Sequence, residues 1–192
     1  LLSLSPPLLT FLVFSTSYFS SFLLPPPPLS FSLSPSIFLC SVSVLAGLLY
    51  FTGSRADYSL LKILIKKFSN QKSFNTKVAA GGHHFSKLFG YTYKEIFKDK
   101  IRLNYRSKIK IKDTNVNELI KFLGNSLKNY SKLITKAKPD IVILLGDRYE
   151  TFCFCVASFF LNMPIAHIHG GELTYGAFDD GLRHSITKLS NF

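Results

Sequence analysis

Residues 139–192, PDIVILLGDRYETFCFCVASFFLNMPIAHIHGGELTYGAFDDGLRHSITKLSNF, carry the pattern that decides the fold. The uncharged run 141–146 predicts a buried parallel strand, and the mostly apolar segment 148–161 predicts a buried helix. A second short strand is expected at 164–168, and a last helix starts near Phe178. A strand, a helix and a second parallel strand form a right-handed βαβ unit, with ligands expected at the carboxyl edge of the sheet.

The segment before residue 139 continues this alternation of strands and helices. Alternating elements of this kind indicate an α/β fold with a parallel, doubly wound sheet of about four or five strands. The expected elements are strands at 44–52 and 74–80, helices at 57–68, 89–97 and 116–137, and a β-like connection over 98–112.

Apolar spacing predicts which helix faces are buried. In helix 57–68 the inward residues are Leu60, Leu61, Leu64, Ile65 and Phe68. In helix 116–137 they are Leu119, Ile120, Leu123, Leu127, Tyr130 and Ile134. In the last helix the expected stripe is Phe178, Leu182, Ile186 and Leu189, which leaves Asp179, Asp180, Arg183, His184 and Lys188 mostly away from it.

Charge is unevenly distributed along the chain. The formal net charge is +12, yet residues 1–54 contain no Lys, Arg, Asp, Glu or His. The lysines stand singly among apolar residues without an aromatic cluster, so we expect a solvated surface and no nucleic-acid partner.

There are three cysteines and no CxxC, and Cys153 and Cys155 should point to different faces of their helix. They are typical of small core residues in a reducing compartment, so we expect a cytoplasmic protein.

Residues 1–43 are a low-complexity leader of Leu, Ser, Phe and Pro that we expect to lie outside the fold of residues 44–192. A secretory signal needs a basic start, and a membrane helix needs about 20 apolar residues without breakers. The favoured interpretation is a non-native or mis-set start, because these four residue types have codons that can consist of pyrimidines alone. A signal or membrane-contacting segment is the less favoured alternative.

Several polar groups follow the strands. Thr52 to Asp57 is a strand–turn–helix junction whose backbone N–H groups could approach a phosphate, or an ordinary loop with Asp57 as the helix N-cap. Asp147 to Glu150 fits a capping box as well as a reactive site. His167 and His169 alternate and should share one face. A hydrogen-bonded histidine pair is preferred to a metal site there, and no metal is expected.

Six motifs in order carry a family resemblance: TGSRADYSLL at 52–61, FGYTYKEI at 89–96, then GDRYE, PIAHIHGGE, GAFDD and RHSITKLS. They are similar to the UDP-N-acetylglucosamine 2-epimerase family, most closely to its hydrolysing branch. The resemblance covers about residues 47–192. It implies the N-terminal Rossmann-like domain of a truncated, GT-B-type, two-domain enzyme with its site in the cleft between the domains.

The resemblance also implies residue roles. Asp147, Asp179 and either His169 or Glu172 form the expected acid/base set, since HIHGGE stands here where hydrolysing members often have HIEGGE. Nucleotide binding is implied for Arg55, Ser59 and Arg148, and His83 or His84 is expected near the sugar. Further expected substrate-binding residues are His167, Arg183 and His184.

The implied reaction converts UDP-N-acetylglucosamine and water into N-acetylmannosamine and UDP without a cofactor. The alternatives are the same reaction on a UDP-diacetamido-trideoxyhexose, and a non-catalytic α/β remnant or binding module. The expected partners are the UDP-sugar and, in the full-length enzyme, further copies of the chain. The 192-residue chain is expected to be a fragment with little or no activity alone.

Overall fold

A five-stranded parallel sheet forms the centre of the molecule in the computed structural model, which describes residues 45–109 and 115–192. The strand order is β3-β2-β1-β4-β5, so the sheet is wound in both directions from β1. The expected doubly wound sheet of four or five strands is therefore confirmed. The strands are β1 (Ala46–Thr52), β2 (Phe74–Ala80), β3 (Tyr105–Arg106), β4 (Ile141–Leu145) and β5 (Ile165–Ile168).

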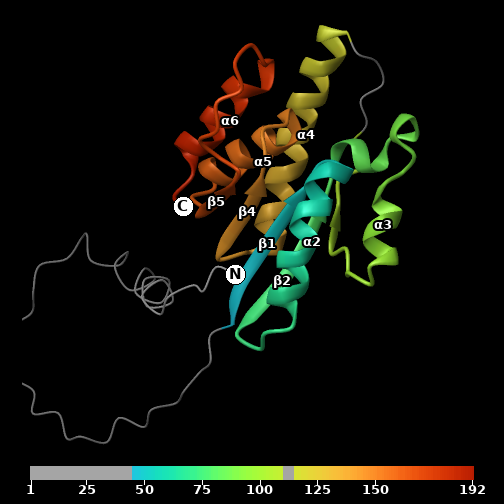
Figure 1. The fold of residues 1–192 in the computed structure, drawn as a ribbon, viewed down its shortest axis with the longest axis vertical. Coiled ribbons are helices and arrows are strands. Elements are labelled where there is room, and N and C mark those ends of the chain that lie inside the picture. Colours follow the sequence, from blue (N-terminus) through green and yellow to red (C-terminus); the bar gives the residue numbers. More distant parts are fainter. Residues whose placement is uncertain (1–44, 110–114) are drawn as a thin grey trace, which may run out of the picture. The chain divides into compact units, whose positions relative to one another are not determined.

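Helices cover both faces of this sheet (Figure 1). One core packs β1 and β4 against α4, α5 and α6, and the other packs β1 and β2 against α2 and α3. Because β1 is central, its side chains alternate between the cores: Leu49 and Phe51 join the first, and Leu48 and Tyr50 the second. The helices are α2 (Arg55–Ser69), α3 (Tyr93–Lys98), α4 (Val116–Ala137), α5 (Tyr149–Phe160) and α6 (Phe178–Leu189), with 3-10 turns η1 (Gly82–Phe85) and η2 (Lys87–Phe89).

The prediction that Cys153 and Cys155 are small core residues on different faces of their helix is confirmed, whereas Cys40 lies outside the described residues. Cys153 and Cys155 are both buried and free, and they belong to the same core. The Cys153 thiol faces the Leu123 carbonyl of α4, whereas the Cys155 thiol faces the Ile186 carbonyl of α6. Burial raises the pKa of both thiols to about 12, so neither is an activated nucleophile.

The predicted inward faces of three helices are wrong in part. Leu60 of α2 is 58% exposed, Ile120 of α4 is 60% exposed, and Phe178 of α6 is 81% exposed. These helices carry more apolar residues than one face of the sheet can cover. Apolar periodicity therefore does not identify which of several adjacent apolar helix faces packs against the sheet. On α4 the exposed Leu127 also falls outside the core, and the buried residues are Phe122, Ser126, Tyr130, Leu133, Ile134 and Ala137.

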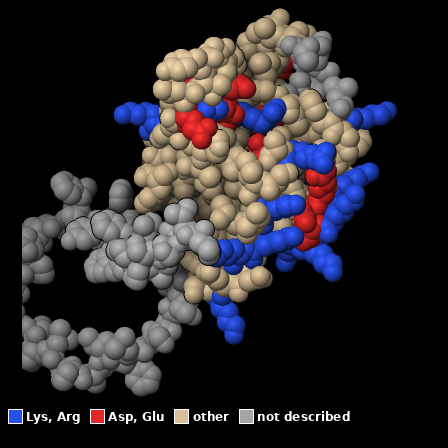
Figure 2. All heavy atoms as spheres, in the orientation of Figure 1, with Lys and Arg blue, Asp and Glu red and all other residues tan. Residues whose placement is uncertain are grey.

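The predictions on the leader, on membrane-spanning segments and on surface charge have different outcomes. The leader of residues 1–43 lies outside the described residues, so the boundary near residue 44 stays a prediction. Within the described part of the chain, no helix combines the length and the apolar character needed to cross a bilayer. Lys and Arg on the face over α2 and α3 lie beside Asp and Glu (Figure 2), and Asp99 alone pairs with Lys62 and Lys66.

Candidate functional site

The candidate site lies at the carboxyl edge of the sheet, where the turns after β1, β2 and β4 meet. Glycines allow these turns to approach the start of α5. A Cβ placed on Gly53 would lie 3.2 Å from the Glu150 Cβ, and one placed on Gly82 would lie 2.6 Å from Glu150 Oε1. Gly82 also has a φ of +56°, a left-handed conformation that favours glycine. Gly82 therefore requires a residue without a side chain, whereas a side chain at Gly53 would need Glu150 to shift by a few tenths of an ångström.

Arg148 and His83 form the centre of this edge. The Arg148 Nη2 group donates to His83 Nδ1, so that nitrogen is an acceptor and the ring proton lies on Nε2, 2.9 Å from the Tyr149 hydroxyl. Burial, and secondly the Arg148 charge, lower the pKa of His83 to about 4. His83 is therefore a neutral imidazole at pH 7, held beside a cationic guanidinium.

Glu150 lies beneath this pair and is completely buried. Its Oε2 is 3.4 Å from Arg148 Nε, and its Oε1 is 3.6 Å from His83 Nδ1. Burial raises the pKa of Glu150 to about 7, although Arg148 acts in the opposite direction. The sequence interpretation used Glu150 only as the last residue of a capping box. The sequence feature that could have identified Glu150 as a buried acid is its place in the first turn of a helix that is otherwise apolar on all sides.

The raised pKa predicts a pH-dependent stability. An ordinary glutamate loses its proton near 4.5, whereas folded Glu150 keeps it until about 7. The folded chain therefore binds the extra proton, and the free energy of unfolding falls by roughly 3 kcal/mol as pH rises through that window. Glu150→Gln should abolish this component in urea denaturation measured across the range. Glu118→Gln, at a partly exposed first-turn glutamate of α4, should keep it; the same profile in both variants would contradict the assignment.

Asp147 is held by Arg183 and is not a helix cap. Arg183 Nε lies 3.1 Å from Asp147 Oδ2, and the Nη2 group donates to the same oxygen. Arg183 Nη1 binds the Glu172 carbonyl at 3.2 Å and the Thr174 hydroxyl at 3.0 Å. The N-cap of α5 is Arg148, and it makes no side-chain cap. The capping-box interpretation of Asp147 is therefore wrong.

The expectation that Arg183 lies away from the buried stripe is also wrong. Arg183 is only 8% exposed, because its guanidinium turns inward to Asp147. The hydrogen bond to that carboxylate raises the pKa of Arg183. The pair ties α6 to the turn after β4, so it joins two segments that are far apart in sequence.

The two histidines near β5 have different contacts. His167 is in the strand, and its ring nitrogens contact the Gly146 carbonyl at 2.8 Å and the Thr187 hydroxyl at 3.0 Å. Burial lowers the pKa of His167. His169 lies beyond the strand with a φ of +65°, half exposed, and its Nδ1 is 3.4 Å from Glu172 Oε2. The chain leaves the extended conformation at His169, but His169 is close enough to contribute to the lowered pKa of His167, so the shared face stays a prediction.

The acids at the start of α6 have different surroundings. Asp180 accepts the Thr174 N–H at 2.9 Å and lies 3.4 Å from His184 Nε2. Asp179 is exposed in the first turn of the helix. Asp180 thus closes the loop that follows β5, and Asp179 remains on the surface beside the site.

The turn after β1 is closed by its own side chains. Helix α2 begins at Arg55, with Ser54 as the N-cap, and Asp57 completes a capping box. The interpretation of Asp57 as the N-cap is wrong by three positions. Asp57 Oδ2 accepts the N–H groups of Gly53 at 3.3 Å and Ser54 at 3.0 Å. Those donors, which the sequence offered to a phosphate, are already bonded.

Arg55, Ser59 and His84, which were expected to bind the ligand, each have protein partners other than Arg148. Arg55 is exposed and pairs with Glu95 of α3 at 3.0 Å, and the Ser59 hydroxyl donates to the Arg55 carbonyl at 2.9 Å. His84 is fully buried, with its two ring nitrogens 2.9 Å from the hydroxyls of Thr52 and Thr92. Of the two neighbouring histidines, the structure therefore brings His83, and not His84, to Arg148.

Comparison with known proteins identifies the family of this chain. A family model described as UDP-N-acetylglucosamine 2-epimerase matches residues 66–192. The chain belongs to the UDP-N-acetylglucosamine 2-epimerase family. It is 36% identical over 140 residues to the GDP/UDP-N,N'-diacetylbacillosamine 2-epimerase (hydrolyzing) of Campylobacter jejuni, which covers 73% of this chain and 36% of that protein. It is 33% identical over 144 residues to the UDP-N-acetylglucosamine 2-epimerase of Neisseria meningitidis serogroup B, with 75% and 37% covered.

Solved structures agree on the fold of this epimerase-family chain. The UDP-GlcNAc 2-epimerase of Neisseria meningitidis bound to UDP-GlcNAc matches with a TM-score of 0.66 and 21% identity, over 76% of this chain and 39% of that one. MurG of Acinetobacter baumannii matches with a TM-score of 0.53. The expected Rossmann-like domain of GT-B-type proteins is confirmed. The chain spans a little over a third of the length of these relatives.

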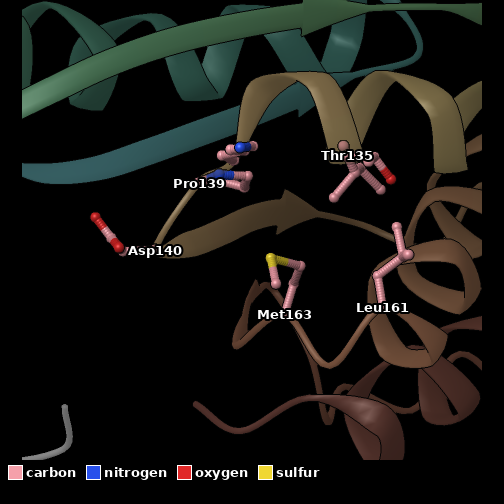
Figure 3. A pocket seen from close by; sticks show the side chains of 7 residues that line it. Thr135, Pro139, Asp140, Leu161 and Met163 are labelled. Carbon is pink, nitrogen blue, oxygen red and sulfur yellow. The ribbon is translucent and has the colours of Figure 1, made fainter.

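A hollow lies at the opposite end of the sheet from this site, and Figure 3 shows its lining from close by. It has a volume of about 430 Å³ and lies beside the start of β4. Its lining includes Thr135, Pro139, Asp140, Leu161 and Met163. The Asp140 carboxylate already accepts the Gly47 N–H at 2.6 Å, so its polar group serves to hold the start of β1.

Proposed function

We propose that the protein to which this chain belongs is a hydrolysing 2-epimerase of a UDP-linked 2-acetamido sugar, with UDP-N-acetylglucosamine as substrate and N-acetylmannosamine and UDP as products. The observation that carries the proposal is the pairing at the sheet edge of a guanidinium, Arg148, with a neutral imidazole, His83. The turn after β4 that holds Arg148 also carries the carboxylate of Asp147, which pairs with Arg183. Membership of the epimerase family supports the same reaction class.

The reaction divides into two balanced steps. A base removes the C2 proton while the C1–O bond to UDP breaks, which leaves a glycal with a C1–C2 double bond. Water then adds across that bond, with hydroxide at C1 and a proton at C2 from the opposite face, so C2 is inverted. General acid–base groups are needed in both steps. We assign these to Asp147, Asp179 and either His169 or Glu172, which lie 3.4 Å apart as a pair.

Departure of UDP needs positive charge near the diphosphate. Arg148 is the residue we assign to this role, because its guanidinium is held at the carboxyl edge by His83 and Glu150. Arg55 and Ser59 extend the proposed nucleotide site along the start of α2, and binding would require Arg55 to exchange Glu95 for a phosphate. His83 is assigned to the sugar in place of His84, whose ring is bonded on both sides.

A UDP-diacetamido-trideoxyhexose is the second candidate substrate. Two relatives favour it: the Campylobacter protein, and a Legionella pneumophila UDP-N,N'-diacetylbacillosamine 2-epimerase (hydrolyzing) that is 32% identical over 145 residues. The two sugars differ at C4 and C6, which are remote from the bonds that change. The same acid/base and cationic groups at the carboxyl edge of the sheet could therefore act on both sugars. The choice between them depends on contacts to those two positions.

The test uses the 192-residue chain joined to the C-terminal part of the Campylobacter relative, which supplies a second domain. We expect this chimaera to release UDP and a free sugar inverted at C2, observed by nuclear magnetic resonance in deuterated water with deuterium incorporated at C2. Each UDP-sugar is supplied separately, and the higher kcat/KM identifies the substrate. A folded chimaera that binds neither sugar would contradict the proposal and favour a non-catalytic remnant or binding module.

Metal independence is a further expectation for the same chimaera. No three His, Cys, Asp or Glu side chains within residues 45–109 and 115–192 are grouped so that they could hold a metal ion. We therefore expect unchanged UDP release after incubation with a chelator, measured beside an untreated sample. Loss of activity that zinc restores would instead assign a metal to the His167 and His169 region.

A further inference from the structure

Glu150 is in contact with three separate turns of the sheet edge, although no reacting atom can reach it. The turn after β1 approaches through Gly53, the turn after β2 through Gly82, and the turn after β4 through Arg148. A fully buried carboxyl group that touches all three turns can fix their mutual positions. A buried acid is costly to keep, so its retention at the first turn of α5 requires a compensating partner.

We propose that Glu150 is a positioning residue that orients the Arg148 guanidinium toward the diphosphate of a UDP-sugar and keeps the His83 ring, which is assigned to the sugar, beside it. The identity of the ligand in this inference rests on the proposed function, whereas the contacts of Glu150 do not depend on it. Oε2 faces Arg148 Nε at 3.4 Å, which leaves the Nη2 group of Arg148 to His83 Nδ1. Orientation of the guanidinium by Glu150 thus sets the tautomer of His83.

The charges around Glu150 favour this role over a reactive one. Arg148 is the cation that faces it, and His83 is neutral near pH 7. Asp57 faces it from α2 and opposes its ionisation. Tyr149, Tyr130 and Cys153 face it as neutral groups, and their own pKa values are raised partly by Glu150. When Glu150 is ionised its one attractive partner among these groups is Arg148, and when it is protonated this ion pair is lost.

The first experiment needs no catalytic activity. In the nitrogen-15-labelled 192-residue chain at about pH 8, we expect a protected Arg148 Nε–H signal and a single His83 tautomer with the proton on Nε2. Lowering the pH through about 7 should shift the Arg148 signal as Glu150 takes up its proton. This titration of the unaltered chain tests the proposal even if a variant fails to fold, and an Arg148 signal that does not respond would overturn it.

Two variants separate positioning from simple packing. Glu150→Gln keeps the shape of the side chain but removes the charge, so the Arg148 signal should broaden by exchange and His83 should populate both tautomers. Glu118→Gln, also at a first-turn glutamate, should resemble the wild-type chain. Wild-type Arg148 and His83 signals in a folded Glu150→Gln chain would overturn the proposal.

The functional consequence is measured in the chimaera. Because Arg148 is assigned both to binding the diphosphate and to its departure, Glu150→Gln should raise KM for the UDP-sugar and also lower kcat, so that kcat/KM falls about tenfold or more. Glu118→Gln should leave both constants unchanged. If the wild-type chimaera releases no UDP, the proposed function fails while the spectra still decide the positioning role. Normal KM in Glu150→Gln, in an active chimaera, would overturn the diphosphate part of the inference.

Discussion

Asp147→Asn is expected to lower the rate of UDP release by the chimaera about 10²–10⁴-fold, because the amide keeps the shape of the side chain but cannot accept a proton. The structure makes this a test of chemistry, since Asp147 does not cap α5. Asn still offers a carbonyl oxygen to Arg183, so the contact between α6 and the turn after β4 should persist in weakened form. Initial rates at saturating UDP-sugar measure the effect.

A matched control is available at the other end of β4. Asp140→Asn alters a carboxylate that is one residue before the strand and accepts the Gly47 N–H, far from the carboxyl edge. We expect its turnover to equal that of the unaltered chimaera. Circular dichroism of both variants establishes that they are folded. UDP release near the wild-type rate by the Asp147→Asn variant would remove Asp147 from the acid/base set and leave it as a partner of Arg183.

Gly82→Ala is expected to lower the free energy of unfolding by about 2–5 kcal/mol. The left-handed φ of +56° costs an L-residue about 1–2 kcal/mol. The new methyl group would also lie 2.6 Å from Glu150, and overpacking of a buried contact costs typically about 1–3 kcal/mol. Urea denaturation of the 192-residue chain gives the value.

Gly90→Ala separates the two contributions. Gly90 has a similar φ of +72°, but a Cβ there would meet nothing within 4 Å. We expect only the backbone cost of about 1–2 kcal/mol. The difference between the variants then measures the contact with Glu150. Equal losses would mean that the turn after β2 can move away from Glu150, contrary to the close approach seen in the structure.

Residue patterns placed most of the strands and helices and the candidate edge, although the helix expected at 89–97 is the 3-10 turn η2 followed by α3. The apolar run after Pro139 predicted a buried strand, and alternation of strands with helices leaves few topologies other than a parallel doubly wound sheet. Polar residues that follow parallel strands necessarily meet at one edge. For that reason Asp147, Arg148 and His169 could be assigned to one region from the sequence, and the family motifs at 147–150 and 164–172 reinforced that assignment.

Only the tertiary structure decided which of several equivalent side chains face that edge. His83 and His84 are neighbours with the same chemistry, and the turn at Gly82 directs one to Arg148 and the other into the core. Arg183 turned inward because Asp147 lies across from it, a contact between residues 36 positions apart. Glu150 acquired its raised pKa from burial beneath two glycine turns. Local periodicity contains no information on such long-range contacts, because they depend on where other segments pack.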